Sequence, residues 1–244
     1  MNIYWLEQSE RDIPSGDWLN EGELSRWNAM RFAKRRADWR LGRWTAKRAV
    51  AAYFDLSANL DTLRTIELRP APSGAPQVFL SNQLAAVSIS LSHRSGIAAV
   101  ALAQPASSLG CDLELIEPRS RGFIVDYFTP DEQSLLAGAP PEDHPALVTL
   151  LWSAKESVLK ALSVGLRQNT RFVSVEPVFT ASPTPGWHEL SARCHDGQVF
   201  HGWWQRNGGL VRTLVSSPAS TAPLALVPPP LAADAPKPRL ILVS

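Results

Sequence analysis

Two short segments of the chain carry the residues best suited to chemistry on phosphate. One segment, residues 110–114, holds two carboxylates, and the other, residues 152–160, follows about forty residues later with a third carboxylate and two lysines. Hard divalent cations bind carboxylate oxygens, and ammonium groups bind phosphate oxygens. The pattern therefore predicts a site that handles a divalent metal and a phosphate ester. Its charged residues are Asp112, Glu114, Lys155, Glu156 and Lys160.

The first segment has the period of a strand. Apolar and polar residues alternate over residues 110–116, so Asp112 and Glu114 are expected to share one face of a strand. Side chains two residues apart on a strand are about 7 Å apart, and two carboxylates at that distance on a poorly hydrated face repel each other unless a cation lies between them. This repulsion is a physical argument for a metal.

The second segment has the period of a helix. Apolar residues recur at helical spacing over residues 147–162, after Asp143 and Pro145, which are helix start signals. Glu156 and Lys160 are then one turn apart. Taken alone, such a pair could be a surface contact that stabilises the helix by about 0.3–0.5 kcal/mol.

Magnesium suits these carboxylates better than zinc does. Mg²⁺ needs few protein carboxylates and leaves places for water and phosphate. Neither Cys111 nor Cys194 has a second cysteine or a histidine at the spacing of zinc ligands. Two cysteines also form no disulfide framework, and free thiols are expected.

The two segments together resemble the signature of the 4'-phosphopantetheinyl transferases, specifically the larger, two-lobed, surfactin-synthetase-activating type. The signature is Gly-x-Asp-x-Glu, then Trp-Ser-x-Lys-Glu-Ser-x-x-Lys after about forty residues. The resemblance covers roughly residues 20–180. It implies an enzyme that uses Mg²⁺ to attach the 4'-phosphopantetheine of coenzyme A to a serine of a carrier protein, with release of adenosine 3',5'-bisphosphate.

Carried over residue by residue, the resemblance implies a metal site and a coenzyme site. The implied metal ligands are Asp112, Glu114 and Glu156. Glu156 is also the expected base, and Lys160 the lysine near the phosphates. The implied coenzyme contacts are Arg26, Arg69, Gly74, Ser92, His93 and Lys160. Ala75 departs from the family pattern, which commonly has a lysine there, so one phosphate contact is in doubt.

A partial internal repeat predicts two related halves. Residues 44–50, Trp-Thr-Ala-Lys-Arg-Ala-Val, echo residues 152–158, Trp-Ser-Ala-Lys-Glu-Ser-Val. Each copy lies on a helix-period segment that is followed later by paired apolar strands, at 88–103 and 199–216. The match agrees with the pseudo-dimeric fold that the resemblance implies. Arg48 occupies the place of Glu156, which predicts basic groups on one side of a cleft and carboxylates on the other.

The first of these helices also carries cations at helical spacing. Arg36, Arg40, Arg43 and Lys47 are expected to form a stripe, which is either a solvated face or a surface for coenzyme A or an acidic partner. Between the acidic segments, the aromatic residues Phe123, Tyr127 and Phe128 fall where the family's carrier docks. Aromatic residues at helical spacing are more often part of a core.

The composition of the chain limits the classes of fold and function that are possible. The chain has 244 residues, is 45% hydrophobic, and has a net charge of +1, so it is long enough for one large core or two compact lobes and carries no overall basicity for nucleic acid. No membrane span or signal peptide is visible, and a cytoplasmic enzyme is expected. The family resemblance implies a monomer. Residues 217–237 are rich in proline and alanine and predict a flexible or polyproline-like tail.

We therefore expect an α+β fold, built as a pseudo-dimer of two similar α/β lobes with the active site at their interface. The expected divisions are an N-terminal lobe at 1–105 with coenzyme contacts, a C-terminal lobe at 106–216 with metal and catalytic residues, and a tail at 217–244. The alternatives are a non-catalytic module that binds a carrier protein or coenzyme A, and a Mg²⁺-dependent nucleotide phosphoesterase. The sequence does not indicate which carrier or pathway is served.

Overall fold

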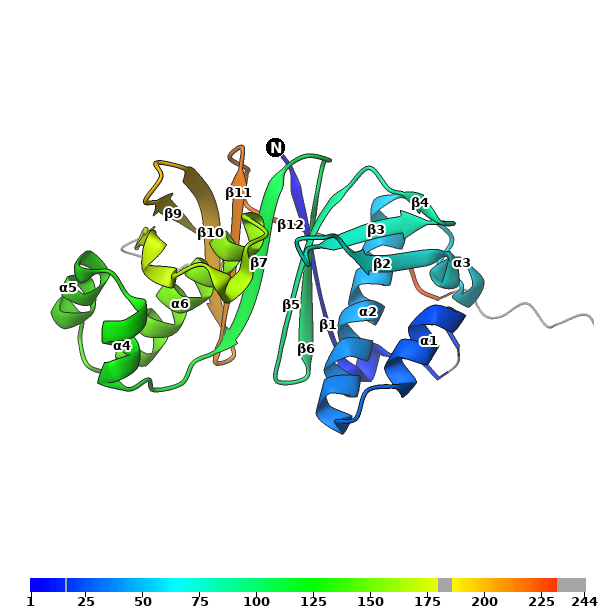
Figure 1. Ribbon diagram of the computed structural model, residues 1–244, viewed down its shortest axis with the longest axis horizontal. Helices are drawn as coiled ribbons and strands as arrows, with labels where there is room; N and C mark the ends of the chain where they lie inside the picture. Colours follow the sequence, from blue (N-terminus) through cyan, green and yellow to red (C-terminus); the bar gives the residue numbers. More distant parts are fainter. Residues whose placement is uncertain (16, 180–185, 232–244) are drawn as a thin grey trace, which may run out of the picture.

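The computed structural model describes residues 1–15, 17–179 and 186–231, which form a mixed α/β fold of two larger sheets placed side by side and a third, small sheet (Figure 1). All strand pairs in the described residues but one are antiparallel. The strands are β1 Ile3–Ser9, β2 Ile66–Pro70, β3 Pro76–Leu80, β4 Gln83–Leu84, β5 Ser88–Arg94, β6 Ile97–Ala103, β7 Ser108–Leu115, β8 Val173–Pro177, β9 His188–Cys194, β10 Val199–Asn207, β11 Leu210–Ser217 and β12 Leu224–Ala225. The helices are α1 Glu21–Asn28, α2 Ala33–Tyr53, α3 Leu60–Thr65, α4 Arg121–Tyr127, α5 Pro130–Gly138 and α6 His144–Ala161. None of the helices among these residues is long and apolar enough to cross a membrane.

Each sheet is covered by one long helix. In the first half of the chain, α2 packs on the sheet ordered β12-β1-β6-β5 and on the small sheet β2-β3-β4. In the second half, α6 packs on the sheet ordered β7-β11-β10-β9-β8. The strand expected at 110–116, the helix expected at 147–162, and both expected strand pairs are confirmed by β7, α6, β5–β6 and β10–β11.

The two halves meet along a shared apolar core. β5 and β6 of the first half lie beside β7 of the second, near the centre of Figure 1. Residues of both sheets form one buried cluster, which includes Trp5, Ala101, Leu113 and Leu214. An ion pair between Arg212 on β11 and Glu7 on β1 also joins the halves. The junction is therefore packed like a protein interior.

The two long helices are anchored in the same way. Lys47 of α2 is fully buried and pairs with Glu23 of α1 at 2.6 Å, and Lys155 of α6 is fully buried and pairs with Glu132 of α5 at 2.8 Å. Both glutamates are the third residue of their helix and close a capping box. One carboxylate thus caps a short helix and neutralises a buried ammonium on the long helix.

We expect Glu132→Gln to lower the free energy of unfolding by about 3–5 kcal/mol, because the buried Lys155 ammonium would lose the carboxylate charge that neutralises it and keep neutral oxygens, among them the carbonyls of Thr170 and Val173. Urea unfolding followed by circular dichroism measures the change. The matched control is Asp61→Asn at the exposed Asp61–Arg64 pair, for which a loss below about 1 kcal/mol is expected. Equal losses at the two sites would contradict the anchoring role.

The proline-rich run differs from the expected flexible tail as far as it is described. Residues 218–231, called the strap here, run from the end of β11 back along the first half. β12 pairs in parallel with β1, matching Leu224 with Tyr4, and Leu226 and Leu231 pack against the first core. The edge strand considered for residues 240–243 lies outside the described residues.

Candidate active site

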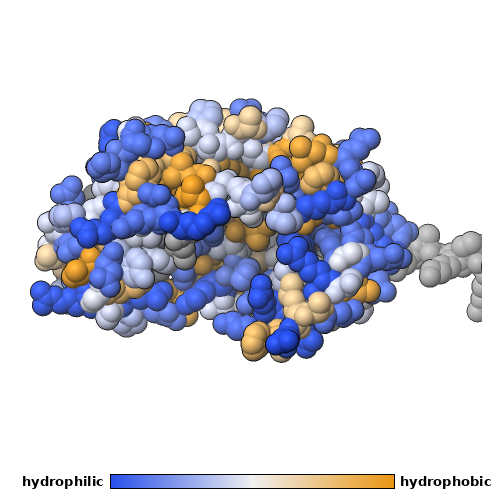
Figure 2. All heavy atoms as spheres, in the orientation of Figure 1, coloured by the Kyte–Doolittle hydropathy of each residue, from blue (hydrophilic) through white to orange (hydrophobic). Residues whose placement is uncertain are grey.

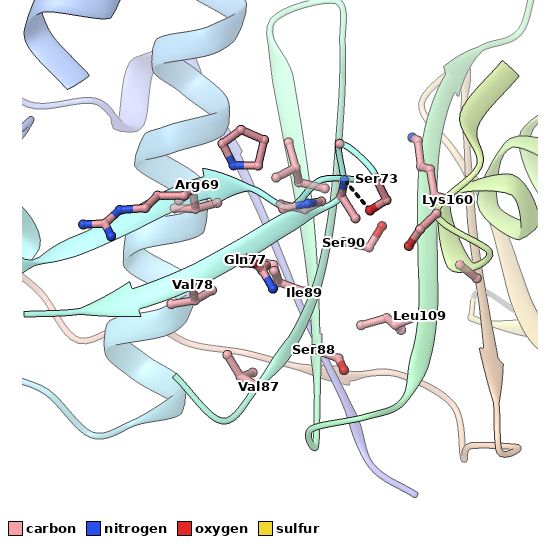
Figure 3. Close-up of a pocket in the computed structure, with 18 of the residues that line it drawn as sticks. Arg69, Ser73, Gln77, Val78, Val87, Ser88, Ile89, Ser90, Leu109 and Lys160 are labelled. Atoms are coloured by element: carbon pink, nitrogen blue, oxygen red, sulfur yellow. Dashed lines mark hydrogen bonds between the residues drawn. The ribbon is translucent and has the colours of Figure 1, made fainter. Parts of the chain in front are cut away.

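A cavity of about 1070 Å³ lies where the two halves meet (Figure 3). Its walls come from α1, α2, the β2–β3 hairpin and β5 of the first half, and from the end of α6 and the turn after it in the second half. We call it the junction cavity. Five cations and no carboxylate line it within the described part of the chain, so it suits an anionic ligand. The cations are Arg26, Arg43, Arg69, Lys160 and Arg167.

Four residues expected to contact the coenzyme, Arg26, Arg69, Gly74 and Lys160, line this cavity. The head group of Arg69 points away from Lys160 in Figure 3, because it is held by Glu67 and by Asn82 at 2.6 Å. Gly74 turns the hairpin with a φ of +92°, which glycine adopts without strain. The structure therefore places these residues together, but not all of them face the ligand space.

Arg167 joins the cavity from the opposite half. Its Nη2 donates to the carbonyl oxygen of Ser73 at 3.0 Å, in the same turn that holds Ala75. A guanidinium thus lies beside the turn that lacks the usual lysine. The sequence analysis missed Arg167, and the only local signal was its place one short turn after the helix of Lys160.

Asp112 is the centre of a dense polar network at the junction. Its side chain is 3% exposed, and Lys160 Nζ donates to its Oδ1 at 2.7 Å. Ser92 of β5 donates to the same oxygen at 2.9 Å, and Ser153 of α6 donates to Oδ2 at 2.8 Å. Burial alone would lower the pKa of Lys160, but the charge and hydrogen bond of Asp112, together with Cys111 and Glu156, outweigh burial and the net pKa is raised. Lys160 is therefore a firmly protonated cation.

Glu114 lies two residues further along the same face of β7. Its Oε2 is buried and accepts no hydrogen bond within the described residues, although Arg94 Nε lies 3.4 Å away. Burial raises the pKa of Glu114, and the charge of Asp112 raises it further. A buried carboxylate oxygen without a donor would be stabilised by an added cation.

Glu156 of α6 faces the same two carboxylates. Burial and the charges of Asp112 and Glu114 together raise its pKa to about 7. Lys160 and Arg94 oppose it. Three carboxylates therefore face two cations, and we call Asp112, Glu114 and Glu156 the acidic cluster. The neighbouring Lys155 points to the opposite side of α6, into the buried pair with Glu132.

The side chains of the acidic cluster are chemically suited to a hard divalent cation. In this conformation they do not converge on one point. The cluster has three carboxylates, and the pKa of two of them is raised. One buried oxygen, Glu114 Oε2, accepts no hydrogen bond within the described residues, so a bound cation would stabilise the cluster. Within residues 1–15, 17–179 and 186–231, however, no three Asp, Glu, His or Cys side chains converge as they would around a bound metal. In this conformation Asp112 forms an ion pair with Lys160.

The other predicted coenzyme contacts, Ser92 and His93, do not line the junction cavity. Ser92 holds Asp112, and His93 lines a second hollow next to Asp38, whose Oδ2 is 4.0 Å from His93 Nδ1. Burial lowers the pKa of His93, and the charge of Lys160 lowers it further. The charge of Lys160 is thus near enough to change the pKa of His93, although His93 lines the second hollow and not the junction cavity.

The expected cationic stripe on α2 is not a continuous solvated face. Lys47 is buried, and the guanidiniums of Arg36, Arg40 and Arg43 lie over Trp27, Trp18 and Trp39. Arg48, which holds the place of Glu156 in the first copy, does not line the junction cavity. It is buried, and its guanidinium donates to the carbonyl of Pro229 in the strap.

A second residue that the sequence analysis missed is Arg94. Every other side chain of β5 reaches β7: Ser90 accepts from the Cys111 backbone, Ser92 bonds Asp112, and Arg94 pairs with Glu114. The alternation of serines up to Arg94 was visible in the sequence. The partner strand was not, because β5 and β7 are neighbours across the junction and not in one sheet.

The aromatic residues considered for carrier docking belong mainly to the core. Phe128 is fully buried, and Phe123 and Tyr127 pack against Trp152 with ring centroids 5.0 and 5.2 Å apart. Only Tyr127 keeps a large exposed fraction, 39%. This group therefore supports α6 beneath the acidic cluster.

Comparison with known proteins agrees with this site. The sequence model of the 4'-phosphopantetheinyl transferase superfamily matches residues 108–207. The chain is 37% identical over 147 residues to 4'-phosphopantetheinyl transferase Svp of Streptomyces mobaraensis, covering 54% of this chain and 58% of that protein. It is 26% identical over 164 residues to 4'-phosphopantetheinyl transferase HetI of Nostoc sp., covering 66% and 67%. It is 36% identical over 83 residues to the holo-[acyl-carrier-protein] synthase of Magnetococcus marinus, covering 32% and 60%.

The segment at residues 108–207, which carries β7 and α6, is thus similar to the 4'-phosphopantetheinyl transferase superfamily. The comparisons agree with the resemblance found in the sequence. The matched region spans about three fifths to two thirds of the length of these relatives.

Proposed function

We propose that this protein transfers the 4'-phosphopantetheine group of coenzyme A to a serine of an apo carrier protein, in a Mg²⁺-dependent reaction that releases adenosine 3',5'-bisphosphate. The junction cavity carries the proposal. Its charged lining residues within the described part of the chain are all cations, and one of them, Lys160, connects it with the acidic cluster. A polyanionic coenzyme and a metal-assisted transfer need this combination of charges.

Each group of the site has a role in this reaction. The serine oxygen of the carrier forms a bond to the β-phosphorus as the pyrophosphate bond to the adenosine bisphosphate breaks. Glu156, directly or through a water, takes the serine proton. Lys160 stabilises negative charge on the phosphate oxygens. Asp112, Glu114 and Glu156 would hold Mg²⁺, which supplies charge neutralisation at the pyrophosphate when it is bound.

We further propose that the halves are two related lobes of a pseudo-dimer, at 1–105 and 106–216, with the active site at their interface. Both halves have one long helix on an antiparallel sheet, and the lysine of each Trp-x-Ala-Lys motif is buried against the glutamate of a capping box. Such a shared arrangement is unexpected for unrelated sequences and supports descent from one duplicated unit. The larger, two-lobed family type follows from it.

The test is transfer itself. Incubation with coenzyme A, Mg²⁺ and a panel of apo carrier proteins should add a phosphopantetheine-sized mass to a carrier, measured by intact-protein mass spectrometry. Removal of Mg²⁺ with EDTA should stop the gain. A folded protein that modifies no carrier in the panel would contradict the proposal. Ranking the carriers by kcat/KM would identify the preferred client.

One observation favours a second candidate, a module that binds coenzyme A or a carrier protein without catalysis. Both carboxylate oxygens of Asp112 are engaged by Lys160 and by two serines. If this network never opens, no metal site forms. Binding of coenzyme A by calorimetry without any transfer would support this candidate.

We expect Arg167→Ala to raise the KM for coenzyme A about tenfold, because a charge-assisted contact to phosphate is lost from the cavity wall. Arg171→Ala is the matched control, since Arg171 is exposed on the next turn of the chain and does not line the cavity. Initial rates at varied coenzyme A separate the two variants. An equal KM for Arg167→Ala and the parent would show that Arg167 only braces the Ser73 turn.

A further inference from the structure

The start of α2 carries an exposed aromatic residue in a basic setting. Phe32 is 71% exposed, more than any other aromatic side chain among the exposed large hydrophobics of the described residues. Arg31, Lys34 and Arg35 around it are exposed as well. In Figure 2 the surface where α2 begins, at the lower edge of the view, shows hydrophobic atoms bordered by strongly hydrophilic ones. We call these four residues the α2 entry patch.

The α2 entry patch continues into the second hollow, which has a volume of about 550 Å³. Phe32, Lys34 and Arg35 form its outer wall, and Asp38, Trp39 and His93 form the rest. Trp39 also lines the junction cavity, so the two hollows share one wall. A macromolecule seated on the patch would therefore lie next to the proposed transfer site.

We propose that the α2 entry patch is the docking surface for the carrier protein, and that the carrier meets it with acidic side chains around one apolar contact. This inference rests on the proposed function, because it supplies the second substrate of that reaction. Aromatic and arginine side chains are common anchors in protein interfaces, and surrounding charges of one sign accelerate association with an oppositely charged partner. The exposed ring of Phe32 offers no hydrogen bond or charge to a phosphate group.

The position of the patch separates it from the coenzyme site. The cations for phosphate line the junction cavity, whereas Arg31, Lys34 and Arg35 do not. Of the three residues considered for docking in the second half, Phe123 and Phe128 are packed in the core. Tyr127 packs on Trp152 and is 39% exposed, less than Phe32. The two substrates thus approach from different sides of Trp39 and meet near Lys160 and His93.

The test uses the full chain with an apo carrier protein that the parent accepts. Arg35→Glu and Phe32→Ala should each raise the KM for the carrier at least tenfold, while the KM for coenzyme A stays within twofold of the parent. The effect of Arg35→Glu should shrink in 0.5 M salt, since exposed charges are then screened to about 4 Å. Arg193→Glu is the matched charge-reversal control, because Arg193 is an exposed residue of β9 in the other half. It should leave both KM values unchanged.

Two results would overturn the docking inference while leaving the proposed function standing: an unchanged KM for the carrier in both patch variants, or a raised KM for coenzyme A instead. If the parent transfers nothing, the proposed function fails on its own. Docking is then decided by fluorescence anisotropy of a labelled apo carrier. Weaker binding by Arg35→Glu than by Arg193→Glu supports the patch, and equal binding or none overturns it. Arg35→Ala replaces Arg35→Glu if circular dichroism shows that the reversal unfolds the protein.

Discussion

Glu156→Gln is expected to lower kcat for phosphopantetheine transfer by at least about 10³-fold, the upper part of the range for loss of a general base. The substitution keeps the size of the side chain but removes its charge and its ability to take a proton. It also removes one of the three carboxylates of the acidic cluster. Initial rates with saturating coenzyme A and carrier measure the effect.

A readout independent of activity accompanies this prediction. Mg²⁺ that binds the folded protein raises its thermal midpoint by mass action, and Glu156→Gln should reduce this shift. In metal-free buffer the variant should be at least as stable as the parent, because Glu156 is crowded by Asp112 and Glu114. Near-normal kcat would remove Glu156 from the mechanism. A full Mg²⁺-induced shift with low kcat would leave it as a base but not as a metal ligand.

Gly110→Ala is expected to destabilise the protein by more than about 3 kcal/mol and to abolish transfer. A Cβ at Gly110 would lie 1.8 Å from the Ser157 carbonyl oxygen and 2.8 Å from the Ala161 nitrogen, both in the backbone of α6. Backbone atoms cannot turn aside, so β7 and α6 must separate, at a cost above ordinary overpacking. That separation would also pull Lys160 from Asp112.

Gly138→Ala is the matched control, since a Cβ there meets nothing within 4 Å and the backbone is not left-handed. Chemical unfolding should show a large loss for Gly110→Ala and little change for Gly138→Ala. A Gly110→Ala protein with parental stability and full activity would show that β7 and α6 have room to adjust. The glycine that opens the Gly-x-Asp-x-Glu motif is thus explained by contact of strand and helix.

The elements of the site could be predicted from the sequence because their signals are local. Alternation places Asp112 and Glu114 on one face of β7, and the helical period places Glu156 and Lys160 one turn apart on α6. The meeting of β7 with α6 followed from the family resemblance alone.

The partners of buried charges could not be predicted in the same way. Lys155 and Glu156 are neighbours in sequence, yet Lys155 is fully buried against Glu132 while Glu156 faces the site. Only tertiary packing decides which side of α6 is turned inward. The strap escaped prediction for a related reason, since the pairing of Leu224 with Tyr4 joins residues 220 positions apart and leaves no periodic signal.

The shared core at the junction has a consequence for how ligands and folding are linked. Trp5, Ala101, Leu113 and Leu214 belong to different sheets but to one buried cluster, and the strap crosses from the second half to β1. Neither half can therefore unfold without exposing the apolar surface of the other. The site exists only when the whole chain is folded, so an anion bound between the halves strengthens every part of the protein at once, including the distant ends of α2 and α6.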